Sequence, residues 1–326
     1  MVDGKKLVVG ASPHLRTKDT TSRIMLDVII ALIPALAASI ALFGPRVLAV
    51  VATTVISAVA SEYIARKVMK RHNTIGDLSA VVTGLILAFN LPVTIPLWMA
   101  AVGSIFAIIV VKQFFGGIGQ NFANPAIVAR IILLLSFGKA MGTWTAPLSW
   151  KTDAVTTATP LAILGGESDA EMPALLDMFL GIRGGCLGET CAVALIIGGI
   201  YLVARKVISL KIPVSFIGTV AVIMLIAGKG DLEFVAQQLM SGGLLLGAIF
   251  MATDYSTSPL KSDGKIVFGI GCGLLTALMR LFAAMPEGVS FAILIMNLLV
   301  PHIETITAPK PFGTVKEKKK KEAEGK

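Results

Sequence analysis

Residues 24–43, IMLDVIIALIPALAASIALF, form a continuous apolar run whose only acidic side chain is Asp27. About 20 helical residues cross a hydrocarbon core of roughly 30 Å, so this run is long enough to span a membrane. The whole chain suits that environment, because 55% of its 326 residues are hydrophobic, only 15% are charged and the mean hydropathy is +0.82. The sequence therefore predicts an all-α polytopic membrane protein.

Further apolar runs follow along the chain and predict about ten transmembrane helices. The runs cover 24–43, 47–65, 78–91, 95–115, 126–137, 191–204, 212–227, 235–251, 266–284 and 289–303. Those at 78–91, 126–137 and 191–204 are too short for a full crossing. Short spans indicate broken helices at the core of the bundle, and errors of a few residues in the boundaries are the alternative explanation.

The runs fall into two groups of about five, separated by the longest connection in the chain. We expect a cytoplasmic N-terminal segment (1–23), a first half of the bundle (24–138), an extracytoplasmic loop (139–190), a second half (191–303) and a basic cytoplasmic tail (304–326). Loops of this length are usually functional.

Two similar hexapeptides favour an internal repeat. Residues 63–68 (YIARKV) and 202–207 (LVARKV) lie 139 positions apart, and each closes an apolar run. A parallel repeat would place a functional cavity between two related halves. Basic motifs at the ends of membrane helices are common, so the similarity is also consistent with two unrelated helix ends.

The basic residues predict the orientation of the chain. With the N-terminus in the cytoplasm, most of them lie inside, and few, such as Arg46, Lys139 and Arg183, lie outside. Both termini are then cytoplasmic and the loop at 139–190 is extracytoplasmic. The polar first 23 residues do not form a cleavable signal peptide. The net charge of +9 is concentrated at membrane edges and in the tail, which indicates contact with membrane lipids and no nucleic-acid function.

The cysteines and histidines do not form a recognisable site. Cys186 and Cys191 are five positions apart, Cys272 is distant, and this spacing fits no common zinc or cluster signature. We interpret all three as packing residues and expect no metal ligands and no intrinsic iron–sulfur cluster. The three histidines, His14, His72 and His302, lie outside the interiors of the apolar runs, so no catalytic triad is expected.

Residues 153–161, DAVTTATPL, lie in the predicted extracytoplasmic loop. They resemble the D-x-x-[ST]-x-A-T motif, in which a flavin transferase joins FMN to the last threonine through a phosphodiester. That threonine is Thr159. The transferase needs a hydroxyl nucleophile on an accessible, flexible segment, and the ester leaves the isoalloxazine ring free to exchange electrons. A solvated Thr-rich loop is the alternative interpretation.

Residues 112–126, KQFFGGIGQNFANPA, follow the fourth apolar run. Asn124 is typical of a helix cap and Pro125 of a first turn. The carboxamides of Asn121 and Asn124 offer donors and acceptors that match a uracil-like flavin edge. Arg130, a turn into the next run, could hold an anionic or electron-rich flavin. A tight reversal between helices and a structural bond of Arg130 are the competing interpretations.

Three acidic residues lie in or beside the apolar runs. Asp254 is surrounded by hydroxyls in ATDYSTSP (252–259), so it is a candidate contact for a coupling ion, and a capped turn is the equal alternative. We expect Glu62 to pair with Arg66 one helical turn on and Asp27 to lie at the lipid headgroups.

Five stretches together resemble a known family. They are TSRIM (21–25), the GG-x-G-x-N-x-x-NPA pattern within 112–126, TATPL (157–161), GET (188–190) and FMATD (250–254). They are similar to the D subunits of the Rnf electron-transport complex, a family related to the B subunit of the sodium-pumping NADH:quinone oxidoreductase. The resemblance covers nearly the whole chain. Ala154 and Thr157 depart from the usual motif, but neither change removes the hydroxyl nucleophile.

The resemblance implies a membrane subunit of an ion-translocating ferredoxin:NAD⁺ oxidoreductase in a prokaryotic cytoplasmic (inner) membrane. It implies an electron relay through covalent FMN on Thr159, coupled to Na⁺ or H⁺ transport. The related B subunit also binds riboflavin non-covalently, so a counterpart is expected near the Asn-containing turn. Implied partners are the other Rnf subunits, including iron–sulfur proteins and a second flavinylated subunit, and a flavin transferase for maturation.

Two other classes of function compete with this interpretation. A secondary transporter or channel without a redox cofactor would show the same spans, repeat and intramembrane charges. A structural scaffold for a redox complex is the third possibility.

Overall fold

The computed structural model describes residues 19–151, 156–166, 168–283 and 288–309. This part of the chain is helical apart from a single antiparallel bridge between Thr145 and Thr156, which confirms the predicted fold class. The longer helices are α1 (Thr21–Phe43), α2 (Arg46–Val68), α3 (Ser79–Phe89), α4 (Leu97–Phe106), α5 (Pro125–Ser136), α9 (Ala192–Ala204), α10 (Lys211–Ala227), α11 (Leu232–Met240), α13 (Ser262–Phe282) and α14 (Val289–Ile306).

Short elements connect these helices. They are the 3₁₀ turns η1 (Ile75–Asp77) and η3 (Ser149–Lys151), the π-helical segments η2 (Ala107–Gln113) and η4 (Gly247–Met251), and the helices α6 (Gly138–Met141), α7 (Pro160–Leu164), α8 (Leu175–Leu180) and α12 (Leu244–Leu246). The segment η2 continues α4 without a break, and η4 continues α12.

The apolar helices correspond to the ten predicted runs. Four of them, α1, α2, α13 and α14, are long and apolar enough to cross a membrane. The pair α11 and α12–η4 passes the same test together but is bent by 66°. The remaining runs form the shorter apolar helices α3, α4–η2, α5, α9 and α10. The three short runs are therefore short unbroken helices, α3, α5 and α9. A broken helix is present as predicted, but it is the run at 235–251.

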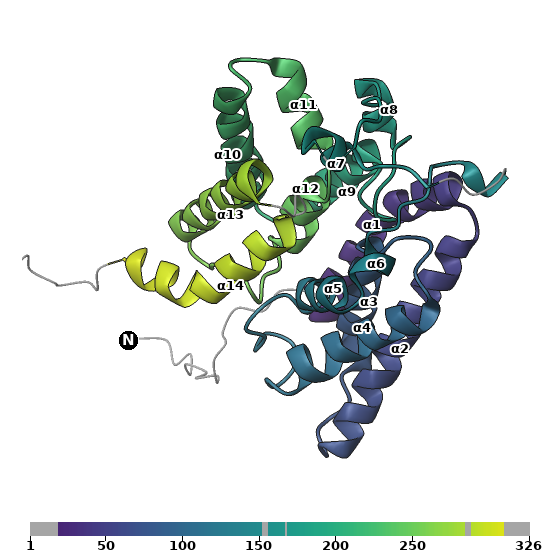
Figure 1. The fold of residues 1–326 in the computed structure, drawn as a ribbon. Coiled ribbons are helices and arrows are strands. Elements are labelled where there is room, and N and C mark those ends of the chain that lie inside the picture. Colours follow the sequence, from purple (N-terminus) through teal and green to yellow (C-terminus); the bar gives the residue numbers. More distant parts are fainter. Residues whose placement is uncertain (1–18, 152–155, 167, 284–287, 310–326) are drawn as a thin grey trace, which may run out of the picture.

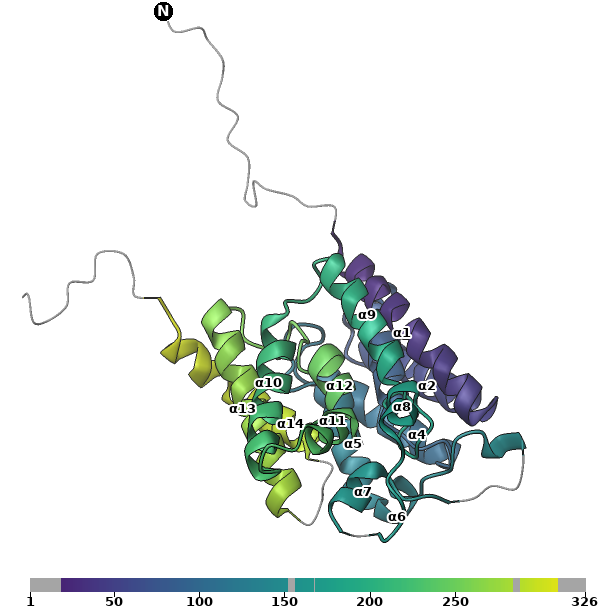
Figure 2. The same cartoon turned by 90° about the horizontal axis from the view of Figure 1, so that it is seen from above.

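The two groups of helices lie on opposite sides of the molecule. Figure 1 shows α1 to α5 on one side and α10 to α14 on the other. The helix α9 belongs to the second group in sequence but packs along α1, as Figure 2 shows. Their close approach depends on Gly198, where an added Cβ would lie 2.1 Å from the carbonyl oxygen of Ala31.

The predicted repeat has a counterpart in the secondary structure. Shifted by 139 positions, η2 falls on 246–252 and overlaps η4, while α5 falls on 264–275 within α13. Both π segments therefore occur at matching places in the two halves. π segments are rare in proteins, and those that occur often lie at functional sites. The turns that follow η2 and η4 are therefore candidates for a functional site.

Residues 183–190, at the end of the long connection, are buried between the helices. The amide of Leu187 donates to Leu91 O (3.0 Å) and that of Gly188 to Phe89 O (2.9 Å), while the Ser39 hydroxyl donates to Leu187 O. Gly188 has no space for a side chain, because an added Cβ would lie 2.3 Å from Phe89. This segment thus closes the bundle at the end where α3 stops.

Candidate functional site

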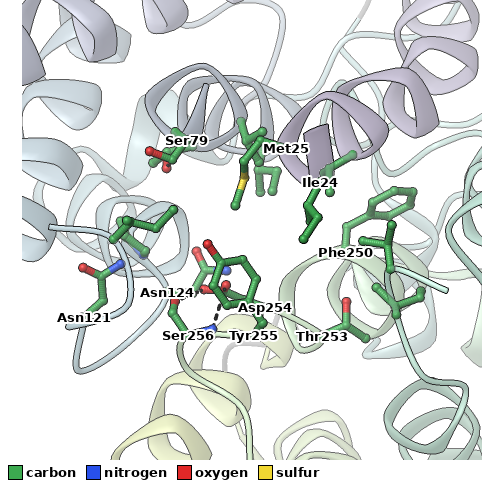
Figure 3. A pocket seen from close by; sticks show the side chains of 18 of the residues that line it. Ile24, Met25, Ser79, Asn121, Asn124, Phe250, Thr253, Asp254, Tyr255 and Ser256 are labelled. Atoms are coloured by element: carbon green, nitrogen blue, oxygen red, sulfur yellow. Dashed lines mark hydrogen bonds between the residues drawn. The ribbon is translucent and has the colours of Figure 1, made fainter. Parts of the chain in front are cut away.

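A cavity lies where α1, α3 and η2 meet η4 and the turns that follow the two π segments (Figure 3). Ile24 and Met25 of α1 cover one side, Phe250 of η4 another, and the polar turns supply the rest of the wall. Its volume is about 90 Å³, which is room for several waters or for the edge of a flat ring. The predicted site residues Asn121, Asn124 and Asp254 all line it.

The two π segments shape the cavity by widening the backbone next to it. The amide of Phe114 donates to Ile109 O (3.0 Å) and that of Ala252 to Gly247 O (2.7 Å), both five residues back. The chain then leaves η2 through Gly117, whose φ of +108° favours glycine. An added Cβ at Gly117 would also lie 2.2 Å from the Arg66 guanidinium.

Asn121 and Asn124 differ in how far the protein satisfies them. Asn124 caps α5: its Oδ1 accepts from the Ala126 amide (3.0 Å), and its Nδ2 donates to Met251 O (3.2 Å). The Oδ1 of Asn121 is buried and has no hydrogen-bond partner in the described part of the chain. Because a buried carbonyl oxygen without a partner is costly, Asn121 is the better candidate for contact with a ligand.

Asp254 lies in a turn formed by its own neighbours. Its carboxylate accepts from the Ser256 amide (3.2 Å) and hydroxyl (3.0 Å) and from the Thr257 hydroxyl (3.2 Å). Burial raises the pKa of Asp254, although these hydrogen bonds and the nearby Lys112 act in the opposite direction. The structure thus contains the expected carboxylate among hydroxyls. Asp254 caps its own turn and is also a polar group in the cavity wall.

A buried ion pair, one member of which lines the cavity, was not predicted. Lys112 Nζ lies 2.9 Å from Glu62 Oε2, and the two side chains are 2% and 0% exposed. Glu62 also accepts from Gln113 Nε2 (3.0 Å) and Thr74 Oγ1 (2.7 Å). The prediction that Glu62 pairs with Arg66 is therefore wrong. The π turn brings Lys112 inward, so that Glu62 meets a partner 50 positions away in the sequence.

Asp27 also has partners on another helix. It is buried, and its carboxylate accepts from the Tyr201 hydroxyl (2.8 Å) and lies 3.3 Å from Arg205 Nη2. Asp27 therefore joins α1 to the end of α9.

Arg130 is buried but is not among the residues that line the cavity. Its guanidinium donates to Asn90 Oδ1 (3.0 Å) and Ser290 Oγ (3.0 Å), and it lies 3.7 Å from the sulfur of Cys186. It therefore connects α5 to α3, α14 and the buried segment at 183–190. The interhelical bond, which was the competing interpretation of Arg130, is the arrangement that the structure contains.

Thr159 lies at the other end of the bundle and caps α7, with its Oγ1 accepting from the Ala162 amide (3.2 Å). Its side chain faces inward, and the residue is only 7% exposed, unlike the accessible acceptor that was expected. Residues 153–155 of the motif lie outside the described residues. The segment packs on two glycines: added Cβ atoms would lie 2.5 Å from Thr157 at Gly184 and 3.2 Å from Leu161 at Gly242.

Comparison with known proteins identifies relatives over almost the whole length. Residues 8–313 match the profile of the NQR2, RnfD, RnfE family. The chain is 49% identical to the D subunit of the Na⁺-translocating ferredoxin:NAD⁺ oxidoreductase complex of Acetobacterium woodii, over 97% of this chain and 98% of that protein. It is 42% identical to the proton-translocating counterpart of Clostridium ljungdahlii (94% and 96%) and 38% identical to the D subunit of the ion-translocating oxidoreductase complex of Stutzerimonas stutzeri (91% and 93%).

Proposed function

The chain belongs to the NQR2, RnfD, RnfE family, and we propose that it acts as the D subunit of an ion-translocating ferredoxin:NAD⁺ oxidoreductase. The main support for this proposal is the 49% identity, over nearly the full length of both chains, to a protein with that name. One such relative is named for Na⁺ and another for protons, so the coupling ion is Na⁺ or H⁺. The chain is a multi-pass membrane component of a larger complex.

Within that complex, Thr159 carries FMN through a phosphodiester. Two features support this: the match of 153–159 to the flavinylation motif, and a threonine hydroxyl that, among the described residues, has one hydrogen bond, from the Ala162 amide, at the start of a five-residue helix. Because Thr159 is 7% exposed, the segment has to open before a flavin transferase can reach the hydroxyl. A helix of five residues has little stability by itself, so opening this segment costs little free energy.

The cavity receives the edge of a second, non-covalent flavin. Two features support this: Asn121, whose buried Oδ1 has no partner in the described part of the chain, lines the cavity, and Ile24, Met25 and Phe250 give it apolar walls, which suit a flat ring with a polar edge. A bound flavin supplies one- and two-electron transfer. Asn121 binds the polar edge, Asn124 fixes the turn that carries Asn121, and the apolar side chains exclude water.

Asp254 is the proposed contact for the coupling ion. It is the carboxylate in the cavity wall, and burial raises its pKa. A buried carboxylate can lower the cost of its negative charge by binding a proton or another cation. Electron transfer nearby would then change the affinity for that cation.

The orientation and the partners complete the proposal. Both termini lie in the cytoplasm and Thr159 lies outside, as the distribution of basic residues predicts. Iron–sulfur subunits and a second flavinylated subunit of the same complex exchange electrons with this chain.

Covalent flavin provides the direct test. The full chain, produced with a flavin transferase, should fluoresce under ultraviolet light in a denaturing gel. Thr159→Ala should abolish the band, since it removes the acceptor oxygen, whereas Thr159→Ser should retain it. Thr157→Ala is the matched control, because Thr157 occupies a variable position of the motif and should not affect the label.

Other results would favour the competing functions. A wild-type chain without fluorescence, from cells in which a known acceptor protein is labelled, would contradict the flavin proposal and favour a transporter without a cofactor. Normal coupled electron transfer in a Thr159→Ala complex would instead support a scaffold role.

A further inference from the structure

We propose that Lys112 binds the non-covalent flavin directly and raises its reduction potential by placing a positive charge beside the ring. This inference rests on the proposed function, namely that the cavity holds a flavin. It adds to Asn121 a second binding residue that lines the cavity.

The first argument is the hydrogen bonding of the ammonium group. Lys112 is 2% exposed, yet it lines the cavity. A lysine ammonium has three N–H donors. Two have acceptors, Glu62 Oε2 at 2.9 Å and Ser79 Oγ at 2.6 Å. The third has no acceptor in the described part of the chain.

The second argument is complementarity with Asn121. Its buried Oδ1 is an acceptor without a partner in the described part of the chain. Lys112 and Asn121 thus line the same cavity, and their side chains include a donor and an acceptor that lack partners in the described part of the chain. Donors and acceptors of this kind suit the pyrimidine-like edge of a flavin, where carbonyl oxygens and a ring N–H alternate.

The third argument is electrostatic. Uptake of two electrons and one proton adds one negative charge to a flavin ring, and charges interact more strongly in a protein interior than in water. Lys112 provides the positive charge in the cavity wall, whereas Asp254 and the neighbouring Glu62 are acidic. Without Lys112, the carboxylates of Asp254 in the wall and of Glu62 behind it would lie near the reduced ring without the positive charge of the ammonium group. Lys112 therefore favours the reduced form.

The test is a redox titration of the intact complex carrying Lys112→Met. The non-covalent flavin is quantified after denaturation, and its midpoint potential is measured by spectroelectrochemistry. We expect a more negative potential: a tenfold loss of preference for the reduced form corresponds to about 30 mV for a two-electron couple. Lys112→Arg keeps the charge and should lie closer to wild type. Lys67→Met removes an exposed charge from α2 and should leave the potential unchanged.

A second variant separates the effect on the flavin from an effect on folding. Lys112→Met combined with Glu62→Gln leaves no unpaired charge from this pair, and covalent fluorescence at Thr159 reports that the chain is assembled. A lowered potential or lost flavin in this assembled double variant supports the inference. Full flavin at the wild-type potential would overturn it. Absence of non-covalent flavin from the wild-type complex would instead refute the cavity proposal, and this inference with it.

Discussion

Lys112 and Glu62 are single residues whose charges the fold buries together. Each would be costly alone in a membrane-embedded bundle, and removing one partner of a buried pair leaves an uncompensated charge. Ser79 accepts a further hydrogen bond from Lys112, and Gln113 and Thr74 donate to Glu62. The stability of this region therefore depends on the two charges being present together or absent together.

We predict that Glu62→Ala destabilises the protein by about 3–5 kcal/mol. The double variant Glu62→Gln with Lys112→Met should lose clearly less than the sum of its two single variants, because no buried charge remains. Thermal unfolding of the purified protein in detergent measures both effects. Additive losses in the double variant would mean that the two charges are not coupled.

At the scale of elements, the contact between α1 and α9 brings the two groups of helices together. Small residues let helix backbones approach closely in membranes. Gly198 does so here, since an added Cβ would lie 2.1 Å from Ala31 O, whereas Gly218 on α10 has open space around it. The two glycines therefore allow a matched comparison.

Gly198→Ala should destabilise the protein by about 1–3 kcal/mol, because α1 and α9 must separate to admit the methyl group. Gly218→Ala should be neutral or stabilising by up to about 1 kcal/mol, since alanine favours helix and meets no obstacle. The midpoint of thermal unfolding distinguishes the two. Equal effects of both substitutions would contradict the assigned contact.

For the whole molecule, the basic residues predict one orientation. Arg71 follows α2 and Lys139 lies in α6, and both are exposed. In the proposed topology they lie on opposite sides of the membrane. Among the native cysteines, Cys186 and Cys272 are buried, while Cys191 is partly accessible.

In a Cys191→Ser background, a membrane-impermeant thiol reagent added to intact cells (spheroplasts, where an outer membrane is present) should label Lys139→Cys but not Arg71→Cys. Inverted vesicles should give the opposite pattern, because the reagent then reaches only the cytoplasmic side. The degree of labelling is read by gel shift. Labelling of Arg71→Cys in intact cells would reverse the topology and move Thr159 to the cytoplasm.

The sequence by itself determined the helical membrane class, the positions of the apolar helices and the family. The free energy of transferring an apolar run from water to a membrane depends on the residues of that run. A run such as 24–43 can therefore be recognised without knowledge of the segments around it. The same holds for local signals, and Asn124 caps α5 as its place before Pro125 predicts.

Only the tertiary structure decided which polar groups meet. Glu62 lies one helical turn from Arg66 but pairs with Lys112. Arg130 is not among the residues that line the cavity beside Asn121, and Thr159 is buried. A side chain in a nearly dry interior takes the partner that helix packing brings within hydrogen-bond distance. That partner can lie 50 or more positions away, where neither spacing nor periodicity in the sequence records the contact.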